Sequence, residues 1–190
     1  MWISIGDFLD QLLPPGSLTV IAGRPAMGCT SLAKQLMSAE RLPKKMQIGI
    51  VYRSPNHGAL LLDLAQTCRN EAGQSVLDPP IYPASAEIKA LAAKLGLPAI
   101  ITCNLRREIE DRTNARPTMD DFLSAHGAEA VSLADQIVLL YRDAYYNSEL
   151  WNTTDYSSEI YVVKNTFGPM GTIHCRWMRD PEHNGILFYE

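Results

Sequence analysis

Short apolar runs alternate with amphipathic segments along the first hundred residues. Residues 18–22 (LTVIA) are apolar and rich in β-branched side chains, which predicts a buried strand. From Cys29, apolar residues recur at helical spacing until Pro43, which predicts a helix directly after the strand. The same reasoning predicts a strand at 47–52, a turn at 55–58, a helix with its apolar face at 60–68, a helix capped by Ser85 and ended by Gly96, and a strand at 99–103.

The second half of the chain changes from helical to strand patterns. Residues 104–131 are polar and charged, and a short helix is predicted after Asp120. An apolar strand at 136–141 precedes a polar, tyrosine-rich loop at 143–157. The last strands are predicted at 160–164, 172–178 and 186–189, joined by turns at 168–171 and 182–185. This order predicts an α/β fold, with a mainly parallel sheet flanked by helices and extended by antiparallel C-terminal strands.

Composition narrows the class of protein. The chain has 190 residues, 46% of them hydrophobic, which fits one domain over 1–190. A net charge of −4 argues against a protein dominated by nonspecific affinity for nucleic acid. The N-terminus lacks the pattern of a secretion signal and no run is long enough to span a membrane, so we expect a cytoplasmic protein without membrane contact. The cysteines and histidines are scattered without ligand spacing, which predicts neither a metal site nor a disulfide framework.

Residues 23–31 (GRPAMGCTS) fit the phosphate-loop pattern G-x-x-x-x-G-K-[ST] at every defined position except one. In that pattern backbone N–H groups cradle phosphates, the lysine reaches the β and γ phosphates, and the Ser or Thr hydroxyl holds magnesium. Cys29 stands where the lysine belongs, although the start of the following helix can still attract an anion. We therefore expect no obligatory cofactor and only weak binding of ATP and magnesium, through Gly23, Gly28, Cys29, Thr30 and Ser31, with Lys164 as a candidate replacement cation.

Several separated segments together resemble one family. The loop AGRPAMG at 22–28 and the ending from Glu159 to Thr172, which contains Lys164 and GPMGT, are the most specific of them. Shorter matches, in the correct order, lie at 88–92, 97–99, 116–117, 134–135 and 141–143. On these motifs the chain resembles the RecA-like C-terminal domain of the DnaB family of replicative DNA helicases. Compared with that family the chain starts at the motor domain, so we expect a truncated form that does not assemble a ring on its own.

The chain departs from the family at positions to which the resemblance assigns catalytic roles. Cys29 replaces the lysine, Arg53 the glutamate that activates water, Asn104 the phosphate-sensing glutamine, and Thr166 the arginine finger. The alignment predicts that the strand with the magnesium-linked aspartate is deleted between 70 and 85, where Asp78 is a candidate remnant. An arginine finger alone contributes about 10³ to 10⁵ in turnover. We therefore predict no catalytic residues and no competent ATPase.

The resemblance also implies contact with single-stranded DNA, because in these helicases the loops after the phosphate-sensing strand face the DNA. The candidate contacts are Arg106, Arg107, Arg112 and Arg116. Acidic residues interleave with them, so a solvated mixed-charge surface is the alternative interpretation.

The function predicted from these observations is that of a noncatalytic binding or regulatory protein in DNA replication or mobile-element maintenance. Its partner would be a replicative helicase or a second copy of the chain. Two alternatives stay open: a weak, atypical ATPase that uses Lys164 or Arg53 in place of the missing lysine, and an accessory protein that binds single-stranded DNA.

Overall fold

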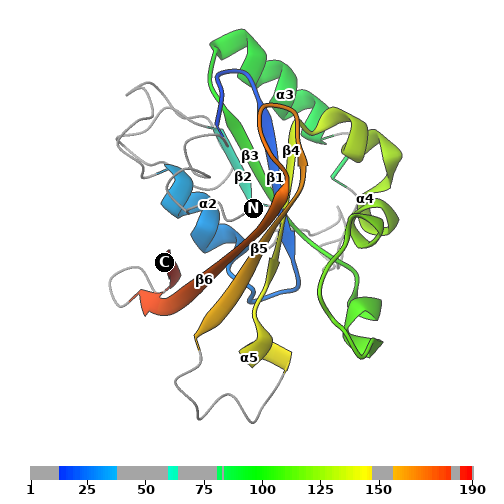
Figure 1. Ribbon diagram of the computed structural model, residues 1–190. Helices are drawn as coiled ribbons and strands as arrows, with labels where there is room; N and C mark the ends of the chain where they lie inside the picture. The colour runs from blue at the N-terminus through cyan, green and yellow to red at the C-terminus, as the bar shows by residue number, and fades with distance from the viewer. Residues whose placement is uncertain are drawn as a thin grey trace, which may run out of the picture.

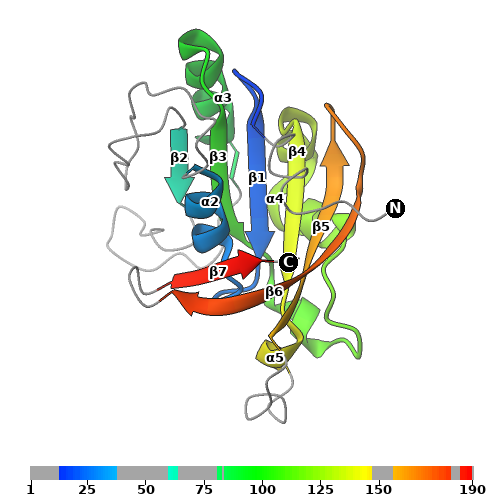
Figure 2. The same ribbon diagram turned by 60° about the vertical axis from the view of Figure 1, so that its left-hand side comes forward.

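A mixed β-sheet forms the centre of the molecule (Figures 1 and 2). The computed structural model describes residues 13–37, 60–63, 81–82, 84–146, 156–180 and 185–189. Within these residues the sheet has seven strands in the order β2-β3-β1-β4-β5-β6-β7. The strands are β1 (Leu18–Gly23), β2 (Leu60–Asp63), β3 (Ala99–Asn104), β4 (Gln136–Tyr141), β5 (Ser157–Asn165), β6 (Gly171–Asp180) and β7 (Gly185–Tyr189). The strands from β2 to β4 run parallel, and β5, β6 and β7 each run antiparallel to the preceding neighbour.

Helices cover both faces of the parallel part of the sheet (Figure 2). Helix α2 (Cys29–Met37) lies on one face, and α3 (Ala84–Leu95) and α4 (Met119–Leu133) lie on the other. A 3₁₀ helix, η1 (Arg107–Asp111), follows β3, and the short helix α5 (Asp143–Tyr146) follows β4. Thr118 and Asp121 form a capping box that starts α4.

The sequences of the central strands are continuous apolar runs, because both faces of these strands are buried. In β1, Ile21 packs into the cluster under α2, whereas Val20 and Ala22 pack into the cluster under α3 and α4. All six residues of β1 and all six of β4 are buried. Each side of the sheet therefore has its own hydrophobic core.

Asp135 fixes the amino ends of the central strands. Its carboxylate accepts hydrogen bonds from the backbone N–H of Leu18 at 2.8 Å and from Lys89 Nζ of α3 at 3.0 Å. Its backbone N–H donates to the carbonyl of Leu18 at 2.9 Å. These bonds tie β1, β4 and α3 together at one point.

The C-terminal hairpin turns back over α2. β6 curves so that β7 lies beside α2, as Figure 2 shows, and Phe188 of β7 enters the core under that helix. The side-chain amide of Gln35 donates to the Phe188 carbonyl at 2.7 Å and accepts from the Phe188 N–H at 3.0 Å. Gln35 thus pairs with the edge of β7 as a neighbouring strand would, and it satisfies backbone groups that would otherwise need water.

The predicted fold class is confirmed, including the parallel sheet and the antiparallel C-terminal strands. The prediction of a helix over 60–68 is wrong for residues 60–63. These residues form strand β2 and pair in parallel with β3. A short apolar run fits a buried strand as well as a helix, and only the pairing with β3 decides between them. The strand predicted at 47–52 and the turn at 55–58 lie outside the described residues. Among the helices of the described ranges, none is both long and apolar enough to cross a membrane.

Replacing Gln35 by alanine should lower the free energy of unfolding by about 1–2 kcal/mol, because the two Phe188 backbone groups lose their partner. Urea denaturation of the full chain measures this difference. Lys94→Ala, an exposed change in the last turn of α3, is the control and should stay within about 0.5 kcal/mol of the unaltered chain. Equal stability of the Gln35→Ala chain would show that the two hydrogen bonds between Gln35 and Phe188 contribute nothing to the free energy of unfolding.

Candidate functional site

The loop between β1 and α2 has the backbone shape of a phosphate loop. Ala26 and Gly28 take left-handed conformations, with φ of 66° and 100°. The Met27 N–H donates to the Arg24 carbonyl at 3.1 Å, and the Leu32 N–H donates to the Gly28 carbonyl at 2.8 Å, which starts α2. A left-handed alanine is uncommon outside strained or functional turns. The predicted order of strand, glycine loop and helix is therefore present.

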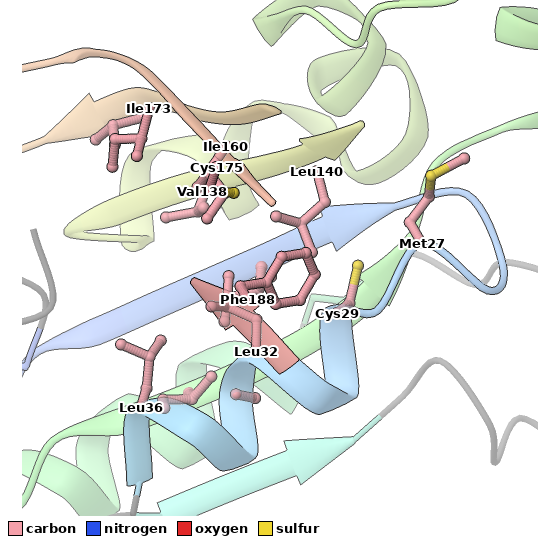
Figure 3. Packing of buried hydrophobic residues seen from close by; sticks show 14 of the residues in the cluster. Met27, Cys29, Leu32, Leu36, Val138, Leu140, Ile160, Ile173, Cys175 and Phe188 are labelled. Carbon is pink, nitrogen blue, oxygen red and sulfur yellow. The ribbon is translucent and has the colours of Figure 1, made fainter. Parts of the chain in front are cut away.

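Cys29 occupies the lysine position and packs into the hydrophobic core. Its side chain is 6% exposed and lies in the cluster under α2, as Figure 3 shows. A Cβ atom placed on Gly23 would lie 3.0 Å from Cys29 Sγ and 3.1 Å from Met27 Cβ, so the cysteine fills the space over this glycine. The helix start thus presents no ammonium group at the position where the pattern requires one.

Asn104 lies beside the loop, as its predicted place after the phosphate-sensing strand requires. It is the register partner of Gly23 across the parallel pair of β3 and β1. The next residue, Leu105, donates its N–H to the Gly23 carbonyl at 2.9 Å. Thr30 and Ser31, in the first turn of α2, are half-buried.

β2 adds a parallel strand beside β3, whereas the segment 70–85, where the magnesium-linked strand was expected to be deleted, lies mostly outside the described residues. β2 lies next to β3 with Leu60 opposite Ala99 and Asp63 opposite Thr102, so its carboxyl end lies on the edge of the sheet that carries the loop. In phosphate-loop enzymes an aspartate at the end of a neighbouring strand holds magnesium together with the loop Ser or Thr. Asp63 has that place in the fold, whereas Asp78 lies outside the described residues. Three leucines followed directly by an aspartate were the sequence signal for this strand.

The structure contradicts the assignment of Lys164 to the phosphate loop of its own chain. β5 runs antiparallel to β4, which pairs Lys164 with Ile137 near the amino end of β4, at the edge opposite the loop. Lys164 Nζ donates to the carbonyl of Val131 at 2.8 Å, at the end of α4. The pKa of Lys164 is lowered, chiefly by burial. Thr166 is at the same edge, where its N–H and hydroxyl both donate to the Asp135 carbonyl, at 3.0 and 2.9 Å.

Two arginines that sequence reasoning did not assign to the site hold the loop from its flanks. Arg24, 9% exposed, bonds Glu110 of η1 at 2.8 Å and the Leu105 carbonyl at 2.6 Å. Arg142 follows β4 and donates from Nη2 to the Ala26 carbonyl of the loop. No local sequence signal marks this contact, because it depends on the sheet placing the end of β4 beside the loop.

The four arginines considered for DNA contact do not share one environment. Arg112 pairs with Asp121 at 3.0 Å, and Arg116 binds Glu159 through two bonds of 2.8 Å each. Hydrogen bonding to Glu159 is the main cause that raises the pKa of Arg116. Arg106 and Arg107 are exposed at η1, and Arg107 lies 3.4 Å from Glu110. DNA contact stays a prediction, and Arg106 and Arg107 are the side chains most available for it.

The residues present fit a magnesium nucleotide only in part. The loop backbone, Thr30, Asn104 and Asp63 have suitable places, but position 29 has no cation and Lys164 lies at the far edge. Arg53, at the position of the family's glutamate, lies outside the described residues. Phosphate recognition by a lysine at position 29 is therefore not available in this chain.

Comparisons with known proteins agree with this geometry. A family model described as the DnaB-like helicase C terminal domain matches residues 45–183. The replicative DNA helicase DnaB of Geobacillus stearothermophilus is 35% identical over 96 residues, which cover 50% of this chain and 20% of that protein. The replicative DNA helicase DnaC of Bacillus subtilis (strain 168) is 30% identical over 124 residues, which cover 65% of this chain and 26% of that protein.

Solved structures share the fold. A DnaB-like replicative helicase, described together with its interactions with primase, superposes with a TM-score of 0.60 at 18% identity, and the match covers 88% of this chain and 56% of that one. The RadB recombinase superposes with a TM-score of 0.57 at 14% identity, and the match covers 94% of each chain. At these identities the similarity concerns the fold, and the predicted RecA-like fold is confirmed. The chain spans only 20% to 26% of the length of the two curated helicases named above.

Replacing Lys164 by methionine should destabilise the chain by about 1.5–3 kcal/mol, because the end of α4 loses a charged donor to its carbonyl groups. Any affinity of the isolated chain for phosphate should stay unchanged, since Lys164 lies at the opposite edge. Urea denaturation and calorimetric titration with pyrophosphate test the two statements, with Lys94→Met as the exposed control. Loss of phosphate affinity without loss of stability would place Lys164 at its own loop.

Proposed function

The chain belongs to the family of DnaB-like helicase C-terminal domains, and on that premise we propose that it is a noncatalytic member that acts by binding a protein partner in DNA replication or mobile-element maintenance. The observation that carries this proposal is the buried Cys29 at the lysine position. The fold keeps the phosphate loop, yet the cation that would polarise the phosphates is replaced by a core side chain.

The expected contributions of the missing lysine, arginine finger and base are large enough to support the proposed absence of ATP hydrolysis. One charge-assisted hydrogen bond from the lysine is worth about 10-fold to 150-fold in phosphate affinity. The arginine finger contributes about 10³ to 10⁵ in rate and a positioned base about 10² to 10⁴. Thr166 and Arg53 stand at those two positions, so weak binding can survive while hydrolysis does not.

The outer face of the C-terminal hairpin is suited to a protein partner. Met178 and Leu187 are opposite each other on β6 and β7 and are 48% and 37% exposed, and Tyr189 is 38% exposed. Trp177 and Phe188 point to the other face of the hairpin and pack against the core under α2. Exposed apolar side chains that form a contiguous patch often mark a surface that binds another protein. The partners that the family suggests are a replicative helicase and a second copy of the chain.

We expect the purified chain to form a complex with the replicative helicase of its host, or with itself, at micromolar concentration. Leu187→Asp should weaken that complex at least about 10-fold, because the charge would be buried at the interface. Size-exclusion chromatography with light scattering measures it. Leu123→Asp changes a leucine on α4 that is 42% exposed; it is the matched control and should bind normally. The absence of any complex would count against the proposal.

A weak, atypical ATPase is the second candidate, and the position of Asp63 on the same edge as Thr30 favours it. Under the first proposal the chain releases no phosphate from ATP and magnesium above the blank. Under the second it releases phosphate slowly, and Thr30→Ala lowers the rate at least about 10-fold, whereas Thr113→Ala, an exposed threonine in the loop before α4, does not. A release assay with both variants decides between the candidates.

A further inference from the structure

The outer face of the C-terminal hairpin carries an arginine beside its exposed apolar side chains. Side chains alternate along a strand, so Arg176 and Met178 of β6 lie on the face opposite Trp177. Tyr189 of β7 is directly opposite Arg176, and Leu187 is directly opposite Met178. All four side chains of this face are exposed. Arg176, Met178, Leu187 and Tyr189 are therefore neighbours on one surface, the hairpin patch.

The strands that carry the hairpin patch are held in place from their other face. Phe188 packs into the core under α2, as Figure 3 shows. Trp177 packs against the same core, with Arg142 Cζ 4.4 Å from the centroid of its ring and the centroid of the Tyr156 ring 5.4 Å away. A surface that is already fixed loses little conformational entropy when a partner binds to it. The hairpin patch is such a preorganised surface.

The edge of β7 limits how a partner can use the hairpin patch. Gln35 of α2 bonds both the carbonyl and the N–H of Phe188, at 2.7 and 3.0 Å. An extended peptide that added a strand to this edge would need the same two backbone groups. The hairpin patch is therefore suited to a partner that lays side chains across the face of the strands, as an amphipathic helix does.

Arg176 forms no ion pair within the described part of the chain. Its register partner on β5 is Ser157. Glu159, the acidic residue of β5, binds Arg116 through both of its carboxylate oxygens at 2.8 Å. A partner that covers the hairpin patch removes the Arg176 guanidinium from water, which is costly unless the partner supplies a negative charge. Charge complementarity thus calls for a carboxylate on the partner.

We propose that the hairpin patch binds an acidic amphipathic helix of a partner protein, with its apolar stripe on Met178 and Leu187 and a glutamate or aspartate paired with Arg176. Single-stranded nucleic acid fits this surface less well, because bases stack on aromatic rings and neither Met178 nor Leu187 has one. The inference rests on the protein-binding function proposed above and adds the chemical class of the partner segment.

The test uses two synthetic amphipathic peptides of about 18 residues with the same stripe of leucines. One peptide carries glutamate and the other lysine at every polar position. The full chain is titrated into each labelled peptide, and fluorescence anisotropy measures binding. The glutamate peptide should bind at least about 10-fold more tightly than the lysine peptide, and its affinity should fall as the salt concentration rises. Equal affinity for both peptides, or no binding of the glutamate peptide at about 0.1 mM chain, overturns the proposal.

Arg176→Glu should weaken binding of the glutamate peptide about 10-fold, because attraction becomes repulsion, and Arg176→Gln should have an intermediate effect. Arg179→Glu is the matched control. It makes the same change at another exposed arginine of β6, on the opposite face of the strand, and should stay within about twofold. Circular dichroism and urea denaturation check that each variant is folded. Equal binding by the folded Arg176→Glu chain overturns the proposal.

The same variants separate this inference from the function on which it rests. A helicase complex that Leu187→Asp weakens and Arg176→Glu does not would keep the proposed function and overturn the acidic partner. Binding of the glutamate peptide through Arg176, without any helicase complex, would support the inference and count against the helicase as partner.

Two other occupants of the hairpin patch would overturn the inference. One is single-stranded DNA, shown by a labelled oligo-dT strand whose binding is lost in the Arg176→Glu chain. The other is a second copy of the chain, shown by light scattering as a self-complex that both Arg176→Glu and Leu187→Asp dissociate.

Discussion

The direction of the strands around β1 is the constraint on which the rest of the structure depends. Because β2, β3, β1 and β4 are parallel, their carboxyl ends meet at one edge of the sheet. That edge gathers the loop after Gly23 with Asn104 and Arg142. β5 reverses the direction, which sends Lys164 and Thr166 to the other edge. The strand directions therefore decide which side chains of this chain can contact the same ligand, since groups at opposite edges of the sheet are too far apart to do so.

Several residues that carry the family resemblance have structural roles in this chain. Asp135 ties Leu18 and Lys89 to the start of β4. Arg116 and Glu159 bind each other through two hydrogen bonds, and the Arg116 guanidinium lies 4.7 Å from the centroid of the Tyr141 ring. These matches maintain the sheet, whereas the departures fall on groups with chemical roles. A chain that keeps the first set and changes the second retains its shape, as the noncatalytic function proposed above requires.

The sequence predicts most of the fold, for reasons that lie in short segments. The apolar runs of β1, β3 and β4 and the periodicity of α3 are local patterns, and the phosphate loop is a local pattern as well. What could not be predicted depends on partners distant in the chain. Leu60–Asp63 becomes a strand through pairing with β3, and the place of Lys164 follows from the direction of β5. Arg142 meets Trp177 only because β6 curves back toward α2.

The cysteine at position 29 contributes to the hydrophobic packing under α2, so its presence means more than the loss of one lysine side chain. Cys29 Sγ lies against Gly23 and shares its cluster with Leu140 and Phe188. A lysine placed there would have to leave this cluster for the loop, which would open a void in the core and bring a second cation close to Arg142. Phe188 in turn is held by Gln35 of the same helix. Restoring the lysine alone would therefore disturb the packing under α2 as well as add a charge to the loop.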